Sequence, residues 1–266
     1  MFSVSIEQGA PVIRGANPFS SKMVWLPAAA LCALAMPFGW TGLFAPVIWL
    51  ALVAIENARG WKKALSFVIA GLLMLVVNSG VIPGNDHIAL LAPYSDDVGN
   101  QIYASFRPAK AVIALTLVLF MLMRPQPLKR ADLPVMAIAI AVPVIAGAFL
   151  LGGSVKLTAT IALAALINLA VVCIAEEGFF RWVLQRGLET GLSQWKMWKW
   201  IVAVAVAALF TTLHTGWAVS PALLALVGIA GLGYALVWTL RGSFWACVFT
   251  HWGVNLFHMT LLKYPF

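Results

Sequence analysis

The chain has 266 residues, of which 62% are hydrophobic and only 10% are charged. Soluble domains typically carry about a quarter charged residues, so this composition excludes disordered proteins, nucleic-acid scaffolds and secreted disulfide frameworks. Seventeen basic and nine acidic residues give a formal net charge of +8. In a chain this apolar, the excess indicates Lys and Arg at the cytoplasmic ends of membrane helices, with no nucleic-acid partner.

Apolar runs long enough to cross a membrane recur along the chain. About 20 residues at about 1.5 Å each span roughly 30 Å of hydrocarbon. The candidate spans are 23–40, 42–56, 64–82, 109–123, 133–152, 157–182, 199–214, 221–240 and 243–262. The break at Pro37-Phe38-Gly39-Trp40 marks either a hairpin or one kinked element. The sequence therefore predicts an all-α polytopic bundle of eight or nine transmembrane helices.

The connections between these spans differ in charge. The segments 56–63, 124–132 and 181–199 are rich in Lys and Arg, whereas 83–108 carries Asp86, Asp96 and Asp97. By the positive-inside rule, the N-terminus and the basic loops are expected in the cytoplasm and 83–108 outside. Residues 1–22 lack an apolar core and are expected to form a cytoplasmic tail rather than a signal peptide.

The segment 83–108 is the longest predicted connection. Long ordered loops often cover or contact a substrate, so one interpretation makes it a lid over a binding site. The alternative is a solvated connector of no special role. His87 within it is interpreted as a solvent-exposed polar residue rather than a ligand.

Ionisable residues inside membrane spans are costly and therefore suggest a functional site. Glu176 and Glu177 follow an unbroken apolar run. Glu177 and Arg181 are four residues apart and can pair on one helical face, whereas Glu176 projects about 100° away and is expected to be left unpaired. Two carboxylates in different environments suit acid–base chemistry. The alternative is an ion pair at a helix end near the interface.

Three polar residues lie in two later spans. His214 ends one apolar run, and His251 and Asn255 are four residues apart in the last span, with His258 on the same stripe. Polar contacts between membrane helices would also explain them. Counted from the cytoplasmic turns, however, Glu176, His214 and Asn255 lie at similar depths of roughly 20 Å. The sequence therefore predicts that three helices bring these side chains to one cavity.

These residues form three ordered motifs: Glu176-Glu177-x-x-x-Arg181, Phe210-x-x-x-His214 and His251-x-x-x-Asn255. The ordered set resembles the CPBP family of CAAX proteases and bacteriocin-processing enzymes, which includes the Ras-converting CAAX endopeptidases. The resemblance covers residues 157–262, which it implies to be a catalytic helical core. Residues 23–156 are then variable N-terminal membrane helices.

The resemblance implies an intramembrane endopeptidase that acts on a membrane-associated or exported protein. Glu176 and His214 would activate a water for attack on the scissile carbonyl. His251 and Asn255 would donate hydrogen bonds to the oxyanion, and Arg181 would hold Glu177. The lipid bilayer and a protein or peptide substrate are the expected partners, and the location expected is a bacterial inner membrane.

Two alternatives to the predicted glutamate-type protease concern the cofactor and the class of protein. Two Glu and two His could hold a zinc ion, yet the HExxH motif is absent, so no cofactor is expected and zinc is the alternative. A proton-coupled transporter would also place ionisable groups in spans, although it would distribute them through both halves of the chain. A non-catalytic relative would be expected to lack at least one motif residue. Serine and two-aspartate protease sites are not supported, since no GxSG motif and no aspartate lies in a span.

Overall fold

The computed structural model describes residues 19, 21–96, 101–191, 197–216, 218 and 220–263. Helices account for most of these residues, which confirms the predicted helical class. The predicted cytoplasmic tail at 1–22 lies outside them, apart from residues 19, 21 and 22, and so does Asp97.

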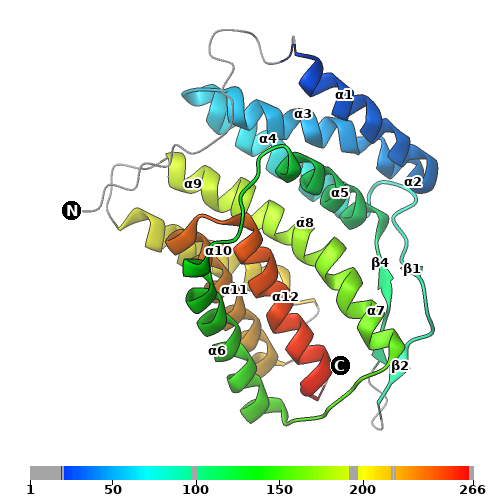
Figure 1. The fold of residues 1–266 in the computed structure, drawn as a ribbon, viewed down its shortest axis with the longest axis vertical. Coiled ribbons are helices and arrows are strands. Elements are labelled where there is room, and N and C mark those ends of the chain that lie inside the picture. Colours follow the sequence, from blue (N-terminus) through cyan, green and yellow to red (C-terminus); the bar gives the residue numbers. More distant parts are fainter. Residues whose placement is uncertain are drawn as a thin grey trace.

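A long helical rod crosses the middle of the molecule (Figure 1). Its consecutive segments are α7 (Ala159–Ile167), η4 (Asn168–Cys173), α8 (Ile174–Glu177), η5 (Gly178–Gln185) and α9 (Arg186–Gly191). Thr158 begins it, because its hydroxyl accepts a hydrogen bond from the Ile161 amide at 3.2 Å. Segments η4 and η5 are π-helical. The predicted span 157–182 is therefore part of a longer helix.

The N-terminal helices lie on one side of the rod (Figure 1). They are α1 (Lys22–Leu31), the 3₁₀ turn η2 (Cys32–Leu34), α2 (Ala35–Gly42), α3 (Phe44–Asn57), α4 (Trp61–Asn78) and α5 (Pro108–Leu122). Helices α4 and α5 contact the rod, and α3 packs against α1 farther out. The Trp49 indole donates to the carbonyl of Val24 at 2.8 Å, and Gly39 at the break adopts a φ of 55°. The break at Pro37–Trp40 is thus a hairpin rather than a simple kink.

The C-terminal helices pack on the opposite side of the rod (Figure 1). They are α6 (Leu133–Leu151), preceded by the 3₁₀ turn η3 (Arg130–Asp132), then α10 (Trp198–Leu213), α11 (Pro221–Arg241) and α12 (Phe244–Leu261). Gly242, with a φ of 60°, ends α11 in the left-handed conformation that glycine adopts without strain. The hydroxyl of Ser243 then caps α12. This tight turn places α12 beside α11.

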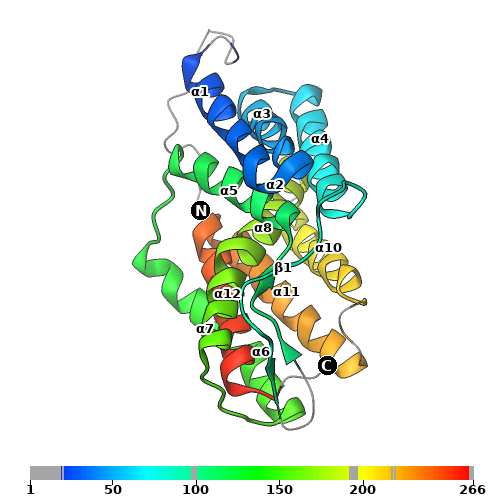
Figure 2. The ribbon, with the colours of Figure 1, turned by 90° about the vertical axis from the view of Figure 1, so that its right-hand side faces the viewer.

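The segment 83–108 contains short strands and is not wholly irregular. Two antiparallel pairings join β1 (Ile88–Ala89) to β4 (Ser105–Phe106) and β2 (Tyr94–Ser95) to β3 (Gln101–Ile102). Strands β3 and β4 contact α7, and Figure 2 shows the segment, labelled at β1, extending along the helical bundle. The pairing satisfies backbone groups that an open loop would leave to water. The segment is therefore a folded ribbon held against the rod.

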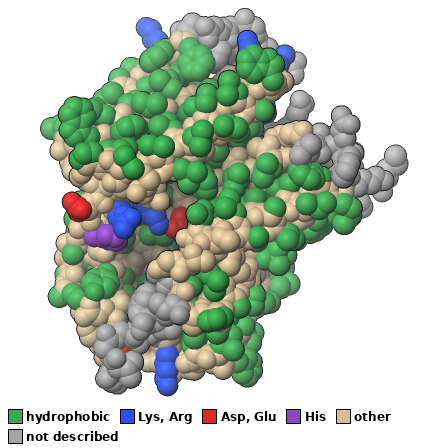
Figure 3. All heavy atoms as spheres, turned by 180° about the vertical axis from the view of Figure 1, so that it is seen from behind, with side chains coloured by type: hydrophobic (Ala, Val, Ile, Leu, Met, Phe, Trp, Pro, Cys, Tyr) green, Lys and Arg blue, Asp and Glu red, His purple; other side chains and the backbone are tan. Residues whose placement is uncertain are grey.

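The chain is an integral membrane protein by the length and composition of its helices. Five helical segments are long and apolar enough to cross a membrane: Lys22–Gly42, Trp61–Asn78, Arg130–Leu151, Ala159–Gly191 and Pro221–Arg241. Three shorter apolar helices accompany them: Phe44–Asn57, Pro108–Leu122 and Trp198–Leu213. Much of the outer surface is hydrophobic, as a lipid-facing surface requires (Figure 3). The count of eight or nine spans stays a prediction.

Candidate active site

A cavity of about 680 Å³ lies beside the rod. Figure 3 shows acidic, basic and histidine side chains gathered at a hollow in a largely hydrophobic face. Both groups of helices and the ribbon contribute to the lining of the cavity, and its polar residues include His87, Lys110, Glu176, His214, His251 and Asn255. The cavity therefore combines an apolar wall with a small set of ionisable groups, as binding sites for organic ligands do.

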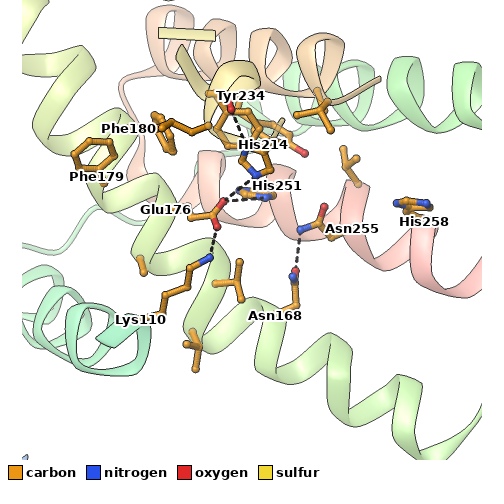
Figure 4. Close-up of a pocket in the computed structure, with 18 of the residues that line it drawn as sticks. Lys110, Asn168, Glu176, Phe179, Phe180, His214, Tyr234, His251, Asn255 and His258 are labelled. Atoms are coloured by element: carbon orange, nitrogen blue, oxygen red, sulfur yellow. Dashed lines mark hydrogen bonds and ion pairs between the residues drawn. The ribbon is translucent and has the colours of Figure 1, made fainter. Parts of the chain in front are cut away.

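Glu176 is the residue on which Lys110, His214 and His251 converge (Figure 4). Its Oε2 atom lies 4.0 Å from Nε2 of His214 and 4.0 Å from Nε2 of His251. The three residues come from the rod, the end of α10 and the middle of α12. The structure therefore brings together side chains from the three helices that the sequence predicted to meet at one cavity.

The expectation that Glu176 is unpaired is wrong. The ammonium group of Lys110, on α5, lies 2.6 Å from Oε1 of Glu176. The two side chains come from helices that pack side by side, although they are 66 residues apart in the chain. Helical spacing along one span gives no information about a partner from another helix. One carboxylate oxygen is therefore bound to a cation, while the other faces the histidines.

Glu177 makes the predicted ion pair and a second contact. Nε of Arg181 lies 2.9 Å from Oε2 of Glu177, and both side chains are fully buried. The other carboxylate oxygen of Glu177 lies 2.8 Å from Nδ1 of His251. A carboxylate can only accept, so Nδ1 of His251 carries the hydrogen. Glu177 thus joins the rod to α12 and directs Nε2 of His251 toward Glu176.

His214 is oriented by its own helix. It follows the last residue of α10, and its Nδ1 atom lies 2.7 Å from the carbonyl oxygen of Phe210. Since a carbonyl accepts, Nδ1 carries a hydrogen, and Nε2 is the ring atom that can act as an acceptor. The ring also lies against that of Phe210, with centroids 4.2 Å apart. His214 therefore offers a hydrogen-bond acceptor to the space beside Glu176.

Asn255 lies one turn along α12 from His251 and is held by the rod. Its Nδ2 atom donates to Oδ1 of Asn168 at 3.0 Å (Figure 4). The same Nδ2 atom also lies 3.9 Å from Sγ of Cys173, so both contacts of the Asn255 amide group are made with the rod. His258 lines the same cavity farther along α12.

Three residues of this site were missed by the sequence analysis: Lys110, Asn168 and Tyr234. Tyr234 stacks on the His251 ring, with centroids 4.5 Å apart. Asn168 offered a signal, because it is a polar residue inside an otherwise apolar run two turns before Glu176. Lys110 offered none, since a lysine at the start of an apolar helix is usual at a membrane surface.

The side chains fit a zinc site poorly. Glu177 directs its oxygens to Arg181 and His251, so it has no donor to offer a metal. The ammonium group of Lys110 lies beside the carboxylate of Glu176, and its positive charge opposes the approach of a dication. Among the described residues, no group of three or more His, Cys, Asp or Glu side chains is arranged to hold a metal ion. The two-Glu, two-His ligand set is therefore not assembled.

The family comparison covers the segment that carries most of these side chains. Residues 158–257 match the family model described as type II CAAX prenyl endopeptidase Rce1-like. These residues form an Rce1-like domain. The match confirms the predicted family for this segment and supports an intramembrane endopeptidase in general terms. No curated protein and no solved structure gives a match to the chain.

The Rce1-like domain contains all the predicted site residues but only part of the cavity lining. Glu176, Glu177, Arg181, His214, His251 and Asn255 all fall within the matched segment. Lys110 and the ribbon residues His87 and Arg107 lie before it and also line the cavity. The N-terminal part of the chain therefore supplies part of the site.

Proposed function

We propose that the chain hydrolyses a peptide bond of a membrane-associated or exported protein with a water activated by Glu176 and His214. The observation that carries this proposal is the approach of Oε2 of Glu176 to the Nε2 atoms of His214 and His251 inside one cavity. Two atoms 4.0 Å apart can each lie about 2.8 Å from one water oxygen, which is a normal hydrogen-bond length. A water there can donate one hydrogen to Glu176 and the other to His214.

In this arrangement the water has a lone pair left for attack. The water oxygen bonds to the scissile carbonyl carbon as Glu176 takes its proton, and the carbonyl oxygen becomes an oxyanion. The proton then passes to the peptide nitrogen, the carbon–nitrogen bond breaks, and an acid and an amine leave. His251 and Asn255 are the donors proposed for the oxyanion, His251 from Nε2 when its ring carries both protons and Asn255 from its amide group, in place of the long 3.9 Å contact with the Cys173 sulfur. Tyr234 and Asn168 keep these two side chains in place.

The first experiment identifies the substrate and tests the base together. Cells that carry Glu176→Gln in place of the parent should accumulate an uncleaved membrane or exported protein, because an amide cannot take a proton from water. Mass spectrometry of new protein termini in the membrane and secreted fractions measures this. Glu56→Gln is the matched control, since Glu56 lies outside the cavity lining. Equal cleavage in the Glu176→Gln and parent cells would contradict the proposed base.

A second experiment separates the proposed mechanism from the zinc alternative. A peptide from the accumulated protein becomes the substrate for purified enzyme in detergent. After treatment with a strong chelator, the enzyme should retain its activity, and elemental analysis should find no stoichiometric metal. Activity lost on chelation and restored by zinc would overturn the glutamate mechanism and leave the protease assignment standing.

A further inference from the structure

We propose that Lys110 is a positioning residue for the catalytic carboxylate, supplied by the part of the chain that precedes the Rce1-like domain. The inference rests on the proposed role of Glu176 as the base. Lys110 lies on α5, and its ammonium group is 2.6 Å from Oε1 of Glu176. The two side chains are only 26% and 14% exposed, so solvent screens their interaction weakly.

The balance of charge around the two adjacent carboxylates supports this role of Lys110. Glu176 and Glu177 are neighbours in the chain, and like charges in an apolar site oppose each other's ionisation. Arg181 neutralises Glu177 within the same helix. Lys110 is the Lys or Arg side chain that pairs with Glu176 among the described residues. With both cations present, the two carboxylates and their partners sum to zero charge, which keeps Glu176 ionised and able to accept a proton.

Lys110 also fixes the direction in which the carboxylate of Glu176 points. Lys110 occupies Oε1, whereas Oε2 has no hydrogen-bond partner among the described side chains. Oε2 is the atom that faces both histidines. The lysine therefore assigns one oxygen to the ion pair and leaves the other for the water. A base fixed in this way needs no rotation during the reaction.

Helix α5, which carries Lys110, is itself held rigidly against the rod. Gly178 follows the two glutamates, and a Cβ atom added there would lie 2.1 Å from Cδ1 of the fully buried Leu117. At the other end of α5, the Asn85 side chain accepts from the amide of Ala109 at 2.9 Å. Close packing and this cap thus fix the helix that carries Lys110.

The groups that face Glu176 come from every element packed around it. They are Lys110 on α5, His214 at the end of α10, Tyr234 on α11, His251 on α12 and Cys173 on the rod itself. Glu177 is adjacent in the chain but faces into the protein. Lys110 is the one group of this set with a fixed positive charge. Its removal leaves a buried carboxylate beside Glu177, so protonation of Glu176 becomes easier and the base is lost at a higher pH.

The test compares Lys110→Met with Lys110→Arg on the peptide found with Glu176→Gln cells. The Met variant should lose roughly ten- to a hundredfold in kcat with little change in KM. The acid limb of its pH–rate profile, where activity falls as Glu176 is protonated, should move to higher pH. The Arg variant should recover most of the rate and the parental limb. Lys110→Gln keeps a hydrogen-bond donor without the charge. If the Met variant does not fold, the acid limb of the pH–rate profile is measured on the Gln variant instead.

Two controls separate this role from a structural one. Lys62→Met makes the same change at an exposed lysine of α4. Glu56→Gln breaks the 2.5 Å ion pair with Arg186, which also joins an N-terminal helix to the rod but lies outside the cavity lining. Both controls should keep the parental kcat and acid limb.

The inference is overturned if Lys110→Met or Lys110→Gln keeps the parental kcat and acid limb. It is also overturned if either variant loses activity with an unmoved limb, or if Lys110→Arg is as impaired as the Met variant. These results leave the proposed function intact as long as Glu176→Gln is inactive. Activity in Glu176→Gln instead contradicts the proposed function itself.

Discussion

At the scale of single residues, the two adjacent glutamates have separate roles because they face different directions. A helical step of about 100° turns Glu177 into the protein, where it meets Arg181 and His251, and turns Glu176 toward the cavity. Arg181 also donates to Gln185 at 3.1 Å and reaches the carbonyl of Gly231. The arginine therefore ties the rod to α11 as well as neutralising Glu177.

This burial predicts a stability effect for Arg181→Ala. Both side chains of the pair have no exposed surface, and removal of one partner leaves an uncompensated charge that costs about 3–5 kcal/mol. Thermal unfolding in detergent should show a large fall in Tm. Arg59→Ala, at an exposed position, should leave Tm close to that of the parent. An Arg181→Ala protein as stable as the parent would contradict the structural role of the pair.

At the scale of elements, the reactive residues sit where the rod departs from regular α-helix. Segment α8, which carries Glu176 and Glu177, lies between the π-helical segments η4 and η5. π-Helical turns often occur at functional sites, since they widen the helix and redirect side chains. Gly178 follows at once, and its missing side chain allows α5 to approach closely. The rod is therefore shaped locally for the contact that delivers Lys110.

We expect Gly178→Ala to separate α5 from the rod. The new Cβ would lie 2.1 Å from a carbon of Leu117, which is fully buried and has little room to move. Such overpacking typically costs about 1–3 kcal/mol, and the displaced lysine should also lower kcat. Gly191→Ala is the matched control, because nothing lies within 4 Å of its added Cβ. Unfolding temperature and kcat measure both effects, and parental values for both would show that the contact is not tight.

At the scale of the whole molecule, ion pairs gather the predicted cytoplasmic loops at one end. Glu56 pairs with Arg186 at 2.5 Å, and Asp132 pairs with Arg241 at 2.7 Å. The segment near Val155 lies at the other end of α6, where Lys156 binds the carbonyl of Leu262. The basic connections thus share one side of the bundle, as the positive-inside rule requires.

Cysteine labelling tests the orientation. In a Cys32→Ser background, Leu128→Cys should react only with reagents that reach the cytoplasm, because it lies among the basic loops. Val155→Cys, at an exposed position on the opposite side, should react with an impermeant reagent from outside the cell. The remaining cysteines are buried and should stay unlabelled. The reverse pattern of labelling would invert the proposed topology.

Features that depend on neighbours along the chain could be predicted before the fold was known. The apolar runs predicted the membrane helices, and the spacing of Glu177 and Arg181 predicted an ion pair that the structure contains. The three ordered motifs that begin at Glu176, Phe210 and His251 were sufficient to predict the family, and depth counting predicted that their helices meet at one cavity. These inferences succeed because helical rise and periodicity are local and regular.

Contacts between side chains on helices that are distant in sequence became known only from the folded chain. Lys110 reaches Glu176 from 66 residues away, Asn168 meets Asn255, and Tyr234 stacks on His251. The hairpin at Gly39 and the short strands of 83–108 could not be decided from the sequence either. Such contacts depend on how helices pack and rotate against each other, which side-chain shapes at the interface set and periodicity within one span does not.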